Sequence, residues 1–112
     1  MNKIKPVLPS LREKKRYLMF EVVATHSLSF DEVRRSINAS LLQFLGELGF
    51  AKAGVMILED WKHNKGMIKV NNKYVDDVRA GLALISKFGN EPVIVRTLGV
   101  SGILRKARAK YS

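Results

Sequence analysis

The sequence predicts an α+β domain in which strands and helices follow one another in the order βαββαβ. Two observations carry this expectation: apolar residues recur every three or four positions in two segments, and β-branched and aromatic residues gather in four others. With 112 residues, 46% of them hydrophobic, the chain is long enough to bury one core. We expect a single domain over residues 1–112: a basic arm (1–15), a sandwich (16–100) and a basic C-terminal segment (101–112).

The first strand and the first helix carry the clearest signals. Residues 16–25 are rich in β-branched and aromatic side chains and contain no glycine or proline, which is typical of a strand. Ser29 and Glu32 have the spacing of a capping box, so a helix is expected to begin there. The apolar stripe of this helix is expected to end near Gly49 and consists of Phe30, Val33, Ile37, Leu41, Phe44 and Leu48.

The middle of the chain predicts a hairpin. Residues 51–60 and 66–71 have the composition of a second and a third strand, and residues 61–65 join them. Asn71 or Asn72 is then expected to cap a second helix, because Asn side chains accept hydrogen bonds from the first free amides of a helix.

The second helix is expected to stop at Gly89, and its stripe is Tyr74, Val75, Val78, Leu82 and Ile85. A fourth strand is expected at residues 93–98, and Ser101 is expected to cap a last, basic helix. This order describes a ferredoxin-like sandwich, the architecture that the RNA-recognition motif also uses, with a four-stranded antiparallel sheet and two helices on one face.

The other face of the sheet is also partly apolar. If Leu18, Phe20 and Val22 face the helices, then Met19 and its alternating neighbours face away from them. We expect the last segment or a protein partner to cover this second face. Leu42, Ala80, Ala83 and Leu84 lie off the buried stripes of the two helices and are candidates for a partner interface.

Positive charge is concentrated at the two ends of the chain. Residues 1–16 hold six bases and one acid, residues 105–112 hold four bases and no acid, and the residues between them hold ten bases and nine acids. This asymmetry favours a polyanionic partner, nucleic acid before an anionic membrane surface. The longest uncharged stretch, residues 36–46, is too short to span a membrane. We expect a soluble, cytoplasmic protein that does not bind membranes.

No catalytic or metal-binding constellation stands out. The chain has no cysteine, and His26 and His63 lie far apart, which excludes structural zinc. Three carboxylate pairs occur, at 31–32, 59–60 and 76–77, and the first and the last suit the positive ends of helix dipoles. We expect no catalytic residue and no cofactor on this chain. Two alternatives remain open: a small-ligand regulatory domain, and a metal-dependent nuclease that uses these carboxylates.

The RNA-recognition motif itself is not matched. Its third strand carries stacking aromatics, whereas Met67 and Lys69 stand at those positions here. Base reading across the sheet is therefore not expected. Trp61, in the basic loop 61–65, either stacks on a base or caps the core, and the sequence does not decide between the two.

Five groups of residues carry more specific motifs: Leu8-Pro9-Ser10-Leu11-Arg12 with Lys15-Arg16-Tyr17, Ser29-Phe30-Asp31-Glu32-Val33, Gly46-Glu47-Leu48-Gly49, residues 79–85 (RAGLALI) and residues 95–102 (VRTLGVSG). In this order they resemble the archaeal ribonuclease P protein component 2 family, over about Leu8 to Tyr111. The resemblance implies a protein subunit that binds and activates the catalytic RNA that removes the 5′ leader of precursor tRNA. It also implies that Mg²⁺ is bound by that RNA.

The partners that the resemblance implies are the ribonuclease P RNA, protein component 3, other ribonuclease P proteins and, through the complex, precursor tRNA. The pair with component 3 can assemble as a dimer of heterodimers. Basic side chains, and backbone amides near the start of the last helix, suit phosphate contacts. The residues expected to bind RNA are Arg12, Lys14, Lys15, Arg16, Lys69, Arg96, Gly99, Ser101, Gly102, Arg105, Lys106, Arg108 and Lys110.

Overall fold

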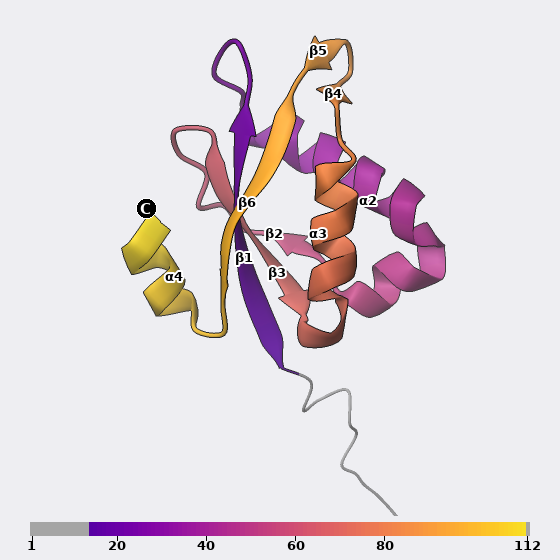
Figure 1. The fold of residues 1–112 in the computed structure, drawn as a ribbon, viewed down its shortest axis with the longest axis vertical. Coiled ribbons are helices and arrows are strands. Elements are labelled where there is room, and N and C mark those ends of the chain that lie inside the picture. The colour runs from indigo at the N-terminus through magenta and orange to yellow at the C-terminus, as the bar shows by residue number, and fades with distance from the viewer. Residues whose placement is uncertain (1–13, 112) are drawn as a thin grey trace, which may run out of the picture.

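The computed structural model describes residues 14–111 and has the expected α+β fold (Figure 1). Its four-stranded antiparallel sheet has the order β2-β3-β1-β6. The strands are β1 (Lys15–Val23), β2 (Met56–Ile57), β3 (Lys65–Asn71) and β6 (Ile94–Ser101). With β1 and β3 at the centre, this is the strand order of a ferredoxin-like sandwich. Of the predicted arm, residues 1–13, including Arg12, lie outside the described residues.

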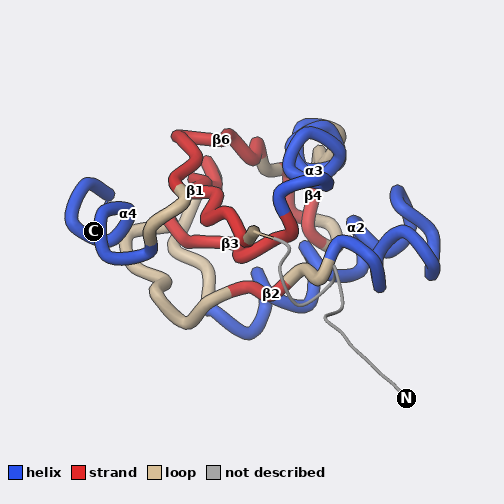
Figure 2. The backbone as a smooth tube through the Cα atoms, turned by 90° about the horizontal axis from the view of Figure 1, so that it is seen from below, coloured by secondary structure: helices blue, strands red, loops and turns tan. Residues whose placement is uncertain are grey.

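Helices cover both faces of the sheet. Figure 2 shows α2 (Phe30–Ala53) and α3 (Val75–Ala83) on one side and α4 (Leu104–Tyr111) on the other. A 3₁₀ turn, η1 (Asn72–Tyr74), precedes α3, and a small hairpin of β4 (Lys87–Phe88) and β5 (Glu91–Pro92) follows it. In the described part of the chain, no helix is both long and apolar enough to cross a membrane.

The main core lies between the sheet and the pair α2 and α3. Leu18, Phe20 and Ile68 on the strands are fully buried against Ile37 and Leu82 on the helices. Burial of apolar surface is the dominant stabilising term in such a fold. The predicted alternation of β1 and β3 is confirmed, because Met19 and Met67 belong to a separate buried cluster on the other face.

The start of α2 is as predicted, but its end is not. The Ser29 hydroxyl accepts a hydrogen bond from the Glu32 amide at 3.2 Å, as a capping residue does. The helix does not end near Gly49: it passes through a break at Gly46 (φ 78°, ψ 167°), resumes, and ends at Gly54 in the left-handed conformation. Glycine is the residue that adopts such backbone angles without steric cost, so the chain bends at Gly46 and then continues as helix.

The predicted apolar stripe of α2 was wrong in its last part. Phe44 and Leu48, expected in the core, are 45% and 69% exposed. The buried face instead follows a four-residue spacing from Ile37 through Leu41 to Leu45, which packs on the core. A strict spacing of four slowly rotates around a helix of 3.6 residues per turn, and this rotation leaves Phe44 to one side. Leu48 follows the break at Gly46, so the periodicity of the first helical segment does not extend to it.

Two further boundaries differ from the prediction. The second strand, expected over 51–60, is only β2, because residues 51–53 are the end of α2. The second helix ends at Ala83 rather than at Gly89, which instead lies in the left-handed turn of the β4–β5 hairpin. Neither asparagine caps α3 as expected: the buried Asn71 amide donates to the Lys52 carbonyl at 2.6 Å.

The last strand is longer than predicted and contains a bulge. Gly99 and Ser101 were expected beyond the strand, but β6 includes both. Met19 pairs with Gly99 and Phe20 with Thr97, so Leu98 is an extra residue in β6. A bulge of this kind redirects a side chain, and Leu98 packs in the cluster on the α4 side of the sheet.

The C-terminal helix covers part of the second sheet face. Ala107 of α4 is 1% exposed and packs with Met19 and Met67, and Leu104 borders the same cluster. The sequence left open whether the last segment or a protein partner covers this face, and the structure shows that the last segment covers part of it. Ser101 lies too early to be the capping residue of α4, but its hydroxyl accepts a hydrogen bond from the Ile103 amide at 3.1 Å just before the helix.

Candidate nucleic-acid interface

The most basic element of the described chain is α4. It contains four Lys or Arg residues and no acidic one, and Arg105, Lys106 and Lys110 are exposed. Ala107 anchors the helix on the sheet, so the charged side chains lie on its outer sides. A row of cations on one helix is the electrostatic pattern that favours contact with a phosphate backbone.

Arg108 has a structural contact as well as a charge. Its Nε and Nη2 donate to the two carboxylate oxygens of Asp60 at 2.6 and 3.1 Å. This hydrogen bond is the largest reason why the pKa of Arg108 lies above its ordinary value, so the guanidinium is firmly charged. The pair ties α4 to the loop after β2. Arg108 was expected to contact RNA, and the structure shows that its Nε and Nη2 donors are engaged by Asp60 within the protein.

One N-terminal base, Arg16, lies beside the segment that leads into α4. Arg16 donates to the Lys15 carbonyl at 3.5 Å, and its Nη1 is so close to Gly102 that a β-carbon there would lie 2.8 Å from it. Gly102 therefore permits the close approach of this guanidinium. Lys14 is exposed, and the Lys15 ammonium donates to the Asn71 side chain. Among the described residues, the structure thus brings Arg16 of the N-terminal basic segment beside Gly102, where the chain enters α4.

The remaining residues expected to bind RNA are more dispersed. Lys69 is half-buried on the α4 side of β3, opposite Tyr17. Arg96 donates to Glu21 at 2.5 Å on the neighbouring strands. Gly99 lies in the sheet ladder rather than in a loop, so its backbone pairs with β1. For these residues RNA binding stays a prediction.

Trp61 is half-buried and packs against the core. Its indole N–H donates to the Leu28 carbonyl at 2.8 Å, and its ring centroid lies 6.0 Å from that of Phe20. These contacts settle the choice that the sequence left open between base stacking and core capping. The rest of its loop was missed as a candidate site: Lys62, His63 and Lys65 are exposed and line one pocket.

The carboxylate pairs have structural positions. Asp31 with Glu32 and Asp76 with Asp77 occupy the first turns of α2 and α3, where negative charge complements the helix dipole. Within residues 14–111, no three His, Cys, Asp or Glu side chains are grouped so that they could hold a metal ion.

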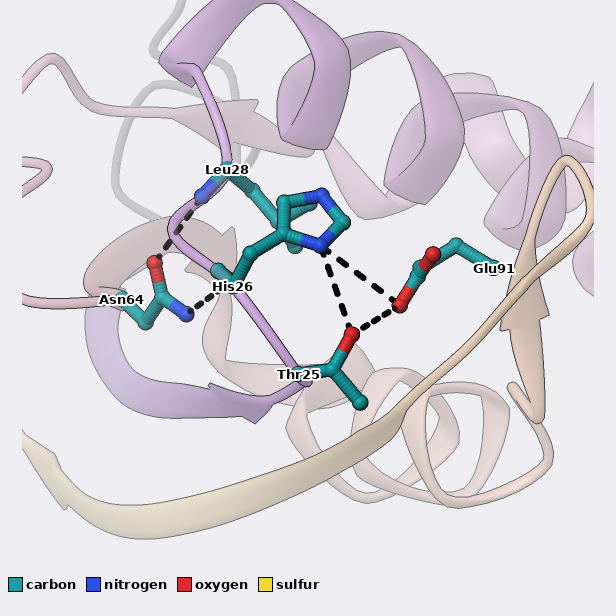
Figure 3. Close-up of polar contacts among 5 residues, drawn as sticks. All are labelled: Thr25, His26, Leu28, Asn64 and Glu91. Atoms are coloured by element: carbon teal, nitrogen blue, oxygen red, sulfur yellow. Dashed lines mark hydrogen bonds and ion pairs between the residues drawn. The ribbon is translucent and has the colours of Figure 1, made fainter.

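One exposed polar cluster includes a histidine. The Thr25 hydroxyl donates to Glu91 at 2.7 Å, and His26 Nδ1 lies 3.7 Å from the same carboxylate oxygen (Figure 3). In a nucleophilic triad the histidine stands between the hydroxyl and the carboxylate. Here the hydroxyl bonds the carboxylate directly, so the cluster links the loop after β1 to β5.

Of the predicted partner residues, Ala80, Ala83 and Leu84 form an exposed apolar surface at α3, whereas Leu42 lies about 160° around α2 from Phe44 and does not line the groove between the helices. Leu84 is 69% and Leu42 41% exposed, and Ala80 and Ala83 are exposed beside Leu84. Phe44 extends this surface across Gly81, where a β-carbon would lie 3.0 Å from the ring. A groove of about 320 Å³ runs between the two helices here. The sequence could not place Phe44 on this surface, because its spacing matched the buried stripe.

Comparison with known proteins adds family relationships. The model of the Rpp14/Pop5 family matches residues 16–112. The chain is 36% identical to ribonuclease P protein component 2 of Pyrococcus horikoshii over 112 residues, which are 99% of this chain and 93% of the relative. It is 37% identical to the protein of the same name from Methanocaldococcus jannaschii over 109 residues, 96% of this chain and 80% of the relative.

A structural neighbour shows the same fold. One chain in the cryo-EM structure of yeast ribonuclease MRP superimposes with a TM-score of 0.67 at 18% identity, over 90% of this chain and 80% of that one. The comparisons support neither the small-ligand regulatory domain nor the metal-dependent nuclease that the sequence left open.

Proposed function

Because this chain belongs to the Rpp14/Pop5 family, we propose that it is a protein subunit of ribonuclease P that binds the RNA subunit and activates removal of the 5′ leader of precursor tRNA. The observation that carries the proposal is the joining of the basic ends. Arg16 lies against Gly102, immediately before the exposed Arg105 and Lys106 of α4. A polyanion that contacts one end of the chain therefore meets the other as well.

The binding mode that this surface supports is neutralisation of phosphates. Arg and Lys side chains on a helix reach backbone phosphates without reading bases, and the sheet lacks the aromatic platform on which bases stack. By lowering the repulsion between RNA segments, such a protein stabilises their close packing. In this account the RNA carries out the cleavage and holds Mg²⁺.

The test is reconstitution of precursor tRNA cleavage with the cognate RNA, with and without this chain and its partner protein, at limiting Mg²⁺. The expected result is faster cleavage, or cleavage at lower Mg²⁺, when the chain is present. Equal rates with and without it, in a complex shown to contain it, would contradict the proposal. Cleavage by the protein in the absence of the RNA subunit would support the alternative function of a metal-dependent nuclease.

A protein partner is a second part of the proposal. Phe44 and Leu84 are exposed and both line the α2–α3 groove, and an exposed apolar groove of this kind favours a protein partner. We assign this surface to protein component 3 of ribonuclease P, in an assembly that can double to a dimer of heterodimers. Sedimentation of the mixed proteins gives the stoichiometry directly, and two chains that sediment separately would contradict this assignment.

A further inference from the structure

A small pocket lies on the α4 side of the sheet, at the end opposite Arg16 and Gly102. It has a volume of about 140 Å³. Its inner wall is formed by the buried Met19 and Met67 with the half-buried Leu98, and its outer wall by the exposed Lys62, His63 and Lys65. The site therefore combines an apolar interior with a basic rim, and the RNA-binding surface on α4 does not include it.

The basic rim stands on a fixed turn. Lys62 and Lys65 exchange two backbone hydrogen bonds of 3.0 Å, and His63 and Asn64 between them both have left-handed angles, with φ of 55° and 57°. These are the features of a two-residue hairpin turn. Asn tolerates this conformation readily, and His adopts it more often than most residues.

A second set of contacts holds this turn to the body of the protein. The Asn64 side chain accepts from the Leu28 amide at 3.2 Å and donates to the His26 carbonyl at 3.3 Å (Figure 3). The Asn64 carbonyl also accepts from the Val22 amide at 2.8 Å. Because the loop is ordered before any ligand arrives, binding at the rim does not have to fix its backbone.

The interior of the pocket is also built by a specific feature. The bulge in β6 directs Leu98 to this face, where it packs beside Met19 and Met67. Methionine side chains are polarizable and make favourable contacts with flat aromatic rings. Because Met19 and Met67 are only 2% and 3% exposed, the apolar surface that a planar ring can contact is mainly that of the half-buried Leu98.

The charge of the site is positive. Asp60 is the one carboxylate that lines the pocket among the described residues, and its two oxygens already accept from Arg108. The charge of Asp60 is thus balanced by Arg108 rather than by the lysines of the rim. Lys62 and Lys65 can therefore attract an anion. A ligand with an apolar planar part and an adjacent anion fits both halves of the pocket.

We propose that this hairpin pocket holds one unstacked RNA nucleotide, with its base against Leu98 above the buried Met19 and Met67, and its phosphate against Lys62, His63 and Lys65. The proposal rests on the proposed function, because it assumes that the chain binds RNA. A helix keeps its bases stacked and paired, so only a bulged or looped nucleotide can enter. The pocket thereby gives a protein that mainly contacts phosphates a means of choosing its position on the RNA.

The test compares two RNA hairpins that differ only by one bulged nucleotide in the stem, using fluorescence anisotropy with the full chain. The wild-type chain is expected to bind the bulged RNA about tenfold more tightly, at the lower end of what one stacked base contributes. Leu98→Trp fills the pocket without changing its charge, and it is expected to bring the ratio of the two affinities to about one.

Val100→Trp is the matched control, because Val100 lies on the same strand, is exposed and faces the other side of the sheet. It should keep the preference for the bulged RNA. The double variant Lys62→Gln with Lys65→Gln provides a second route if Leu98→Trp unfolds, which circular dichroism would reveal. Its control is Arg79→Gln with Lys87→Gln, on the opposite layer of the molecule.

The possible results distinguish failure of the pocket proposal from failure of the proposed RNA-binding function. Equal binding of both RNAs by the wild-type chain, or a preference that survives in Leu98→Trp and in the lysine variant, would overturn the pocket and leave the function standing. Binding of neither RNA at low salt would overturn both. A preference that disappears in the pocket variants and persists in both controls supports the proposal.

Discussion

Arg108 and Asp60 lie 48 residues apart in the chain, yet the guanidinium of one donates to both oxygens of the other. This pair joins the C-terminal helix to the loop after β2, at the edge of the second sheet face. Through this contact Arg108 holds α4 in position, and with it the other basic side chains of the helix. The placement of α4 on the sheet is therefore partly electrostatic.

We expect Asp60→Asn to loosen α4. The variant removes the charge that holds Arg108, while the anchor at Ala107 remains, so the helix should open more often without global unfolding. Hydrogen exchange of the α4 amides should be faster than in the wild type, with the exchange of β1 and β3 unchanged. Glu47→Gln, an exposed acid on α2, is the control. Unchanged exchange in α4 would contradict a bracing role.

Gly46→Ala should destabilise the fold through the backbone alone. No atom lies within 4 Å of the position that a β-carbon would take, but the angles at Gly46 are disfavoured for other residues. The expected loss in the free energy of unfolding is about 1–3 kcal/mol, measured by urea denaturation. At Gly49, in the helical segment after the break, a β-carbon would lie 3.3 Å from the Leu45 β-carbon but needs no unusual backbone angles, so Gly49→Ala should cost less than Gly46→Ala. Equal effects at the two positions would show that the break at Gly46 is not needed.

Leu84→Lys should abolish association with component 3 and leave the isolated chain folded, because Leu84 is 69% exposed. Isothermal titration calorimetry measures the association, and the melting temperature measures the fold. Leu82→Lys is the contrasting variant, since Leu82 is fully buried and the new charge would enter the core. Wild-type affinity in Leu84→Lys would remove this residue from the interface.

Asp76→Asn and Asp77→Asn should weaken the fold slightly and leave cleavage intact. Both acids stand in the first turn of α3, where each contributes about 0.3–1 kcal/mol through the helix dipole. Single-turnover cleavage by the assembled complex is expected at the wild-type rate. A loss of several orders of magnitude from either change would point to a catalytic carboxylate on this chain.

The sequence predicts the fold well where one local signal acts alone. The helix start capped by the Ser29 hydroxyl and the alternation on β1 each have one physical cause, and both are confirmed. It fails where tertiary context decides between two local possibilities. Residues 51–53 have strand composition, but the bend at Gly46 lets the helix resume and carry them with it.

For the candidate nucleic-acid interface, the sequence predicts which basic residues take part but not how they are arranged in space. The two basic ends are visible in the sequence, but their meeting at Arg16 and Gly102 depends on the pairing of β1 with β6. The hairpin pocket has weaker signals, because the bulge at Leu98 and the engagement of Asp60 by Arg108 are long-range contacts. The exposure of Phe44 likewise depends on which face of α2 meets the sheet.

The central claim is that the joined basic ends bind RNA through its phosphates, and the dependence of affinity on salt tests it most directly. Arg105→Gln with Lys106→Gln should weaken binding to unrelated structured RNAs alike, and reduce the slope of log affinity against log salt by about 0.7–0.9 for each phosphate that is no longer neutralised. Arg79→Gln with Lys87→Gln, which removes the same charge from the opposite layer, should leave the slope close to that of the wild type. An unchanged slope in the α4 variant, or an equal change in both, would contradict the account.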